Sequence, residues 1–243
     1  MQNPRKFLGM LTPSSNTVLE PVCGAILSGV PGVTAHFARF RVTEIALSPG
    51  ALSQFDDRPM LEAAALLADA RCHAFSWNGT SAGWIGFDSY RRLCARIREA
   101  TGIPASSSVL ALEEVFRRTA VKRYGMVSPY TDDVQAKIVA NFSAEGFACA
   151  AERHDGRSVN FSFSEVGAAA IERMIREVAG GRPDAITVFC TNMDGASLAE
   201  RLEAELRIPI YDTIALSVWG ALRAAGIDPG LVKGWGRLFR EVH

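Results

Sequence analysis

The chain carries an internal repeat. Three segments of its first half resemble three segments of its second half in the same order: residues 8–18 and 124–134, residues 75–81 and 186–192, and residues 103–109 and 208–214. The offset between matching segments drifts from 116 to 111 to 105 residues. An ordered repeat of this kind predicts two halves of similar fold, with equivalent turns facing each other across a cleft.

Local patterns along the chain favour an α/β fold. Short apolar runs alternate with helical periodicity, which is typical of βα units and a mainly parallel sheet. We expect strands at residues 7–12, 34–42, 73–77, 104–106, 123–128, 147–151, 185–189 and 209–211, and helices at 61–70, 90–100, 132–145, 165–179 and 197–206. The pattern predicts two pseudo-symmetric Rossmann-like lobes, each a mainly parallel four-stranded sheet flanked by helices, with the active site in the cleft between them.

No linker rich in proline, glycine or serine separates the two lobes, and their join is itself helical in pattern. We expect residues 1–106 together with 216–243 to form the first α/β lobe and residues 107–215 to form the second. The C-terminal segment would then return to the first lobe. Residues 158–163 are loop-like and carry aromatic side chains, so we expect them to cover the cleft or to lie at the interface of a homo-oligomer.

Composition argues against several classes of partner. The 243 residues include 26 Lys and Arg and 26 Asp and Glu, so no overall field favours nucleic acid or an anionic membrane. No apolar run approaches the ~20 residues that span a bilayer, and the N-terminus does not resemble a signal peptide, so we expect a cytoplasmic protein. Glycine-rich nucleotide motifs and the H-E-x-x-H metal motif are missing from the sequence, and we expect no cofactor.

The cysteines are odd in number, form no C-x-x-C pair and have no histidine at metal-ligand spacing. We expect reduced thiols, most of them small buried hydrophobic groups. Cys190 differs, because it follows a strand and occupies the position equivalent to Gly79 in the other half. Unpaired N–H groups at such a turn lower the pKa of a thiol, which would let Cys190 exchange a proton with carbon. The alternative is a buried cysteine at the end of a core strand.

Strand-end turns rich in glycine and hydroxyl residues occur at residues 13–17, 78–82, 128–131 and 190–194. Ligands of open parallel sheets bind outside the carboxyl ends of the strands. Backbone N–H groups, helix N-termini and hydroxyls together form an anion site without arginine. We therefore expect a small carboxylic or dicarboxylic acid as the ligand, although the same residues also serve as ordinary helix caps.

Candidate donors to an oxyanion lie in two of these turns. Gly79 permits a close approach of substrate to the backbone, and Thr80 and Ser81 offer hydroxyl groups where charge develops. Tyr130 follows Pro129 and offers a phenol for the same purpose, with a core or interface tyrosine as the alternative.

A second set of candidates follows the first strand. Ser14, Ser15 and Asn16 are expected to bind a carboxylate through their side chains and backbone N–H groups, or to cap the helix that follows. The backbone N–H of Thr191, next to Cys190, is expected to donate to the substrate as well.

These motifs resemble the aspartate/glutamate racemase superfamily, on residues 9–17, 79–81, 128–130 and Cys190. The most similar branches are the arylmalonate decarboxylases and the maleate cis-trans isomerases, and residues 234–239 are similar to a C-terminal G-x-G-R-L pattern in those branches. Racemases and isomerases of the superfamily generally place a cysteine in each half. Arylmalonate decarboxylases have glycine followed by Thr-Ser at the first position and a single cysteine in the second half, which is similar to Gly79 and Cys190.

Two segments depart from the decarboxylase pattern. Residues 13–17 resemble the Pro-Ser-Ser-Asn carboxylate site of the isomerases, and Thr191 and Asn192 stand where the decarboxylases have glycines. The resemblance implies a cofactor-independent lyase that decarboxylates a substituted malonate-like acid, with Cys190 protonating an enediolate. A maleate cis-trans isomerase or another isomerase of the superfamily is the alternative, and a catalytically inactive carboxylate-binding protein is an alternative of another class.

Overall fold

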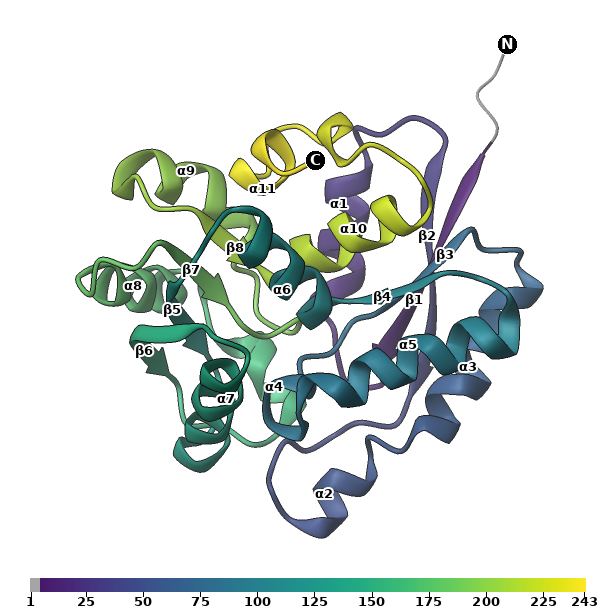
Figure 1. Ribbon diagram of the computed structural model, residues 1–243, viewed down its shortest axis with the longest axis horizontal. Coiled ribbons are helices and arrows are strands. Elements are labelled where there is room, and N and C mark those ends of the chain that lie inside the picture. The colour runs from purple at the N-terminus through teal and green to yellow at the C-terminus, as the bar shows by residue number, and fades with distance from the viewer. Residues whose placement is uncertain (1–4) are drawn as a thin grey trace.

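The computed structural model describes residues 5–243. Two four-stranded parallel sheets form its centre, with the strand orders β2-β1-β3-β4 and β6-β5-β7-β8 (Figure 1). The strands are β1 (Lys6–Pro13), β2 (Val33–Phe40), β3 (Ala74–Trp77), β4 (Ala105–Ser107), β5 (Arg123–Ser128), β6 (Ala148–His154), β7 (Ala185–Val188) and β8 (Ile210–Asp212). The matching strand orders confirm the prediction of two similar α/β lobes.

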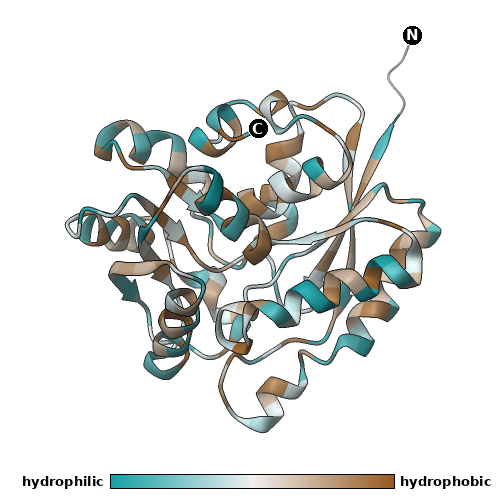
Figure 2. Cartoon of the chain, viewed as in Figure 1, coloured by the Kyte–Doolittle hydropathy of each residue, from teal (hydrophilic) through white to brown (hydrophobic). Residues whose placement is uncertain are grey.

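Helices flank both sheets. They are α1 (Leu19–Leu27), α2 (Pro49–Ser53), α3 (Asp57–Asp69), α4 (Ala82–Ile85), α5 (Phe87–Thr101), α6 (Ser108–Arg118), α7 (Asp132–Ala144), α8 (Ala168–Ala179), α9 (Ala196–Leu206), α10 (Thr213–Ala224) and α11 (Arg237–Glu241), with short 3₁₀ helices η1 (Asn160–Glu165) and η2 (Pro229–Leu231). Apolar and polar residues alternate along α5 in Figure 2, as in a helix with one face on a core.

The strand register reproduces the repeat of the sequence. Leu11 of β1 pairs with Trp77 of β3 in the first sheet. Val127 of β5 pairs with Val188 of β7 in the second, and these are the residues that the repeat makes equivalent. The turns that follow β3 and β7 therefore leave equivalent edges of the two sheets.

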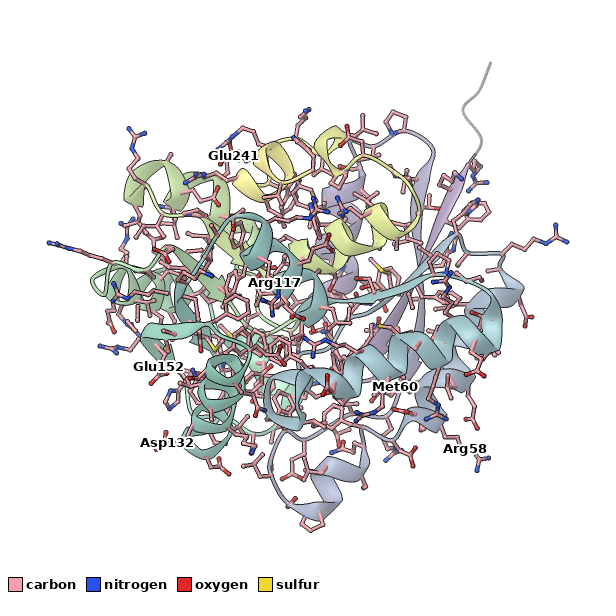
Figure 3. The ribbon with its side chains drawn as sticks, in the orientation of Figure 1. Arg58, Met60, Arg117, Asp132, Glu152 and Glu241 are labelled. Carbon is pink, nitrogen blue, oxygen red and sulfur yellow. The ribbon has the colours of Figure 1, made fainter. Side chains whose placement is uncertain are left out.

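Several predicted boundaries differ from the structure, at β2, α3 and α5 as well as at β6 and α8. β6 continues to His154, because that residue still pairs with Ser128 of β5. His154 also lies between Asp132 and Glu152, at 2.7 and 2.8 Å. Figure 3 shows these two carboxylate residues on the outer side of the second lobe. Helix α8 begins at Ala168 because Gly167 is extended, and the segment before it forms η1.

Helix α10 connects the two lobes. It packs against β3 and β4 of the first sheet and also against β8 of the second, and it lies beside α6 and α1. All of its first ten residues are buried. The division of the chain at residues 106 and 216 stays a prediction, because this helix shares its contacts between both sheets.

Candidate active site

One cavity between the lobes brings together most of the residues that the sequence singled out. Its lining includes Gly79, Thr80, Ser81, Tyr130, Cys190 and Thr191, together with Pro13, Val42, Ile45, Phe55, Trp77, Trp84 and Asn160. The cavity volume is about 20 Å³, enough for about one water molecule. Helix α4, which carries Trp84, lies between the lobes near the centre of Figure 1. The cavity is small, and its walls combine apolar side chains with hydroxyl, thiol and amide groups.

The Cys190 thiol is buried in this cavity. It lies two residues beyond the end of β7, and its Sγ accepts a hydrogen bond of 3.3 Å from the backbone N–H of Asn192. Burial raises the pKa of Cys190 to about 12, and the Asn192 N–H and the Tyr130 hydroxyl lower it only in part. The expectation of a lowered pKa is therefore wrong, because loss of hydration outweighs the turn dipoles. Near neutral pH the thiol keeps its proton.

Tyr130 and Thr80 form a pair of hydroxyls beside the thiol. Their oxygens are 2.5 Å apart, and either one can donate. Burial raises the pKa of Tyr130 well above its usual value, and the neighbouring Cys190 raises it further, so the phenol stays neutral. The Tyr130 ring is held edge-on by Trp84 and Phe163 at 5.3 and 5.5 Å. This pair can present one O–H to an anion in the cavity.

Three residues of the cavity wall have backbone N–H groups without a partner in the described part of the chain. Among residues 5–243, no hydrogen bond uses the backbone N–H of Thr80, Ser81 or Thr191. The turn that carries Thr80 and Ser81 is fixed by Ser108, whose hydroxyl donates to the carbonyl of Gly79 at 2.6 Å. Unpaired, rigidly positioned N–H groups are the usual elements of an oxyanion hole.

Ser81 lies on the cavity wall, but its hydroxyl is 2.7 Å from the hydroxyl of Tyr90. Burial raises the pKa of Tyr90, and the Ser81 hydrogen bond opposes that shift. The Ser81 side chain therefore supports the turn from inside the first lobe. A direct contact between this hydroxyl and a substrate stays a prediction.

The turn at residues 13–17 contributes Pro13 to the cavity, whereas Ser14, Ser15 and Asn16 do not line it. The Ser14 hydroxyl accepts from the backbone N–H of Val42 at 3.2 Å. The Ser15 hydroxyl donates to the Val42 carbonyl and accepts from the Asn160 amide, both at 2.7 Å. These hydroxyls connect β1 to the segments that follow β2 and β6, and their predicted role in carboxylate binding stays a prediction.

Asn16 and Asn192 connect the two lobes. The Asn16 amide donates to the carbonyl and hydroxyl oxygens of Thr191 at 2.9 and 3.2 Å, and its Oδ1 accepts two N–H groups at the start of α1. In the other direction, Asn192 Oδ1 accepts from the backbone N–H of Thr17 at 3.0 Å. The Thr191 hydroxyl donates onward to the carbonyl of Asn78 at 2.9 Å. Because this network is buried, it sets the distance between the turns that carry Gly79 and Cys190.

Several lining residues carry no signal in the sequence. Val42, Ile45 and Phe55 come from the segment after β2, which has no motif. Asn160 belongs to the loop-like segment for which the sequence predicts a position over the cleft or at an interface. The Asn160 carbonyl accepts a hydrogen bond from the Asn192 amide at 2.7 Å, and this contact holds Asn160 at the cavity. Trp84 adds a buried indole whose N–H has no partner among residues 5–243.

The family model described as arylmalonate decarboxylase matches residues 17–239. The chain belongs to the arylmalonate decarboxylase family. This is a branch of the aspartate/glutamate racemase-like enzymes, as the motifs indicated.

Members with either of two activities are similar to this chain. Maleate isomerase of Nocardia farcinica is 29% identical over 248 residues, covering 96% of this chain and 95% of that protein. Arylmalonate decarboxylase of Bordetella bronchiseptica is 26% identical over 151 residues, covering 61% and 63%. The crystal structure of the maleate isomerase Iso from Pseudomonas putida S16 superposes with a TM-score of 0.88 at 24% identity, covering 98% of this chain and 99% of that one.

Two further properties of residues 5–243 bear on partners. No helix there has the length and apolar character needed to cross a membrane. In the same residues, no group of three His, Cys, Asp or Glu side chains is arranged to hold a metal ion.

Proposed function

We propose that this protein decarboxylates a small substituted malonate-like acid without a cofactor. One observation carries the proposal: within residues 5–243, Cys190 is the single thiol on the cavity wall, and Gly79 occupies the equivalent turn. Racemisation by proton exchange between two thiols needs a thiol at position 79, and so does attack on a double bond by a cysteine of the first half. Gly79 supplies no thiol. A decarboxylase needs one proton donor, and Cys190 is a buried, protonated thiol.

The arrangement supports a sequence of simple steps. One substrate carboxylate accepts hydrogen bonds from the Tyr130–Thr80 pair and from the free N–H groups of Ser81 and Thr191. The bond between the α-carbon and the other carboxylate breaks, CO₂ leaves, and the electron pair moves into an enediolate that the same donors stabilise. The small, buried cavity favours this step by removing water from the leaving carboxylate.

Cys190 completes the reaction. Its Sγ–H proton passes to the α-carbon, and the resulting thiolate recovers a proton from solvent water. Because the thiol stands on one side of the cavity, the proton arrives on one face and the product is a single enantiomer. The high pKa of Cys190 means that the thiolate does not persist between turnovers.

Cis-trans isomerisation of maleate or a related unsaturated diacid is the second candidate. It is favoured by the similarity to maleate isomerase, which extends over 96% of the chain, and by the Pro-Ser-Ser-Asn sequence at residues 13–16. Cys190 would then have to act alone as a nucleophile, and its protonated state disfavours that role.

A diacid panel in D₂O separates these functions. Phenylmalonate, methylmalonate, maleate and aspartate are followed by NMR with the wild type, Cys190→Ala and Cys149→Ala, the last being a matched cysteine on β6 outside the cavity. We expect CO₂ release with one deuterium on the α-carbon, abolished by Cys190→Ala and retained by Cys149→Ala. Conversion of maleate to fumarate alone would assign the isomerase function. If diacids raise the Tm without any turnover, the protein is a carboxylate-binding protein.

A further inference from the structure

Gly79 is required by its neighbour Trp77. A Cβ atom added at Gly79 would lie 2.2 Å from Trp77 Cζ2 and 2.7 Å from Cε2 and Cη2. Ordinary contacts of a Cβ begin near 3.4 Å. The indole therefore fills the space into which any side chain at position 79 would project.

The indole has little freedom to move away. Trp77 is fully buried. Its ring lies 4.9 Å from the ring of Phe40 and 6.1 Å from that of Tyr90, measured between centroids. A close-packed ring of this size swings only if its neighbours repack, which costs stability.

The repeat shows what the indole replaces. Trp77 is equivalent to Val188 and Gly79 to Cys190, two residues later in each half. In the second lobe a small side chain precedes a thiol, and in the first a large side chain precedes a glycine. In the first lobe, therefore, the side-chain volume is concentrated at position 77, and position 79 has no side chain. All of these residues except Val188 line the same cavity.

We propose that Trp77 is the specificity-determining wall of the site, standing where a thiol of the first lobe would otherwise reach the substrate. Its indole ring forms part of the wall of the cavity that also contains Cys190. A substituent that lies against this wall must be small, so Trp77 limits the size of the second α-substituent of a malonate-like substrate. This last step rests on the decarboxylase function proposed above.

The steric part is tested by a double-mutant cycle that needs no turnover. Gly79→Ala is introduced into the wild type and into a Trp77→Val background, and Tm values are compared. We expect Gly79→Ala to lower the Tm by roughly 5 °C in the wild type and by less than about 2 °C in the Trp77→Val background, where the smaller side chain leaves room for the added methyl group. Gly24→Ala is the control, since its Cβ would meet nothing within 4 Å, and it should shift the Tm equally in both backgrounds.

Equal effects of Gly79→Ala in the two backgrounds would overturn the proposal. If Trp77→Val does not fold, Trp77→Phe takes its place, because it removes the far ring that overlies Gly79 while keeping an aromatic core residue.

The specificity part is tested by the kcat/KM values for α-methyl- and α-ethyl-phenylmalonate. We expect Trp77→Val to raise the ethyl-to-methyl ratio by about 10-fold, and an unchanged ratio would overturn the role of Trp77 in specificity. If the wild type turns over no malonate while the Tm cycle shows coupling, the decarboxylase function fails and the steric wall stands.

Discussion

The protonation of Cys190 is a measurable property with a defined pH dependence. Burial raises the pKa of this thiol from 9.0 to about 12. The folded protein therefore keeps a proton that the unfolded chain loses above about pH 9, and the associated stability is present below that pH and lost as pH rises toward 12. One pKa unit corresponds to ~1.4 kcal/mol. One pH unit above the unfolded value, at about pH 10, Cys190 lowers the free energy of unfolding by about 1.4 kcal/mol compared with neutral pH.

Urea unfolding of the wild type and of Cys190→Ala, under reducing conditions at about pH 7 and about pH 10, isolates this effect. The difference in unfolding free energy between the two proteins should change by about 1.4 kcal/mol in favour of the variant at the higher pH. Cys23→Ala is the control, since burial also raises the pKa of Cys23 outside the cavity, and it should show a change of the same sign.

The reasoning would be refuted if the difference in unfolding free energy between the wild type and Cys190→Ala did not depend on pH, while the difference for Cys23→Ala changed as expected. The folded protein would then hold the thiol proton no more tightly than the unfolded chain does. A change of the opposite sign would mean that the folded protein stabilises the thiolate, and the role of Cys190 would move from proton donor to nucleophile. That result would favour the isomerase over the decarboxylase function.

Three further predictions concern the site and its support. Tyr130→Phe should lower kcat about 10²-fold with little change in the Tm, measured with the best substrate of the panel, because it removes an oxyanion donor; an unchanged kcat contradicts that role. Asn192→Ala leaves the N–H of Thr17 without an acceptor, and urea unfolding should show a loss of about 2 kcal/mol; a loss below about 0.5 kcal/mol would mean that the connection between lobes is dispensable. Burial raises the pKa of Glu203 to about 7 from 4.5. Relative to Glu203→Gln, the wild type should therefore lose roughly 3 kcal/mol of stability as pH rises from about 4.5 to 7. Parallel pH profiles of the unfolding free energy for the two proteins would argue against a buried neutral carboxyl.

Much of the site was predictable because the repeat marks it. Equivalent positions in two similar halves lie at equivalent sheet edges, so the turns with Gly79 and Cys190 had to meet wherever the lobes face each other. Thr80 and Tyr130 belong to the same strand-end turns, and the structure places their oxygens 2.5 Å apart. Sequence reasoning succeeded here because strand ends and turns are encoded by local patterns.

Other parts of the site depend on contacts between distant segments. Val42 and Phe55 reach the cavity from a segment without a motif. Asn16 has the side chain expected of a carboxylate ligand, yet its amide bonds to Thr191 in the opposite lobe. An amide shows its partner only when the chain has folded, since its chemistry suits a ligand and a neighbouring backbone equally well.

The repeat, the alternation of strands and helices and the single thiol opposite a glycine are properties of the order of residues, and they were sufficient for the two-lobed fold and the location of Cys190. The charge state of that thiol and the reason for the glycine are properties of the folded environment. Burial reverses the pKa shift that a turn dipole alone would cause. The Trp77 ring occupies the space beside Gly79 because packing in three dimensions brings it there. Hydration and volume depend on all surrounding atoms together, so only the tertiary structure decides them.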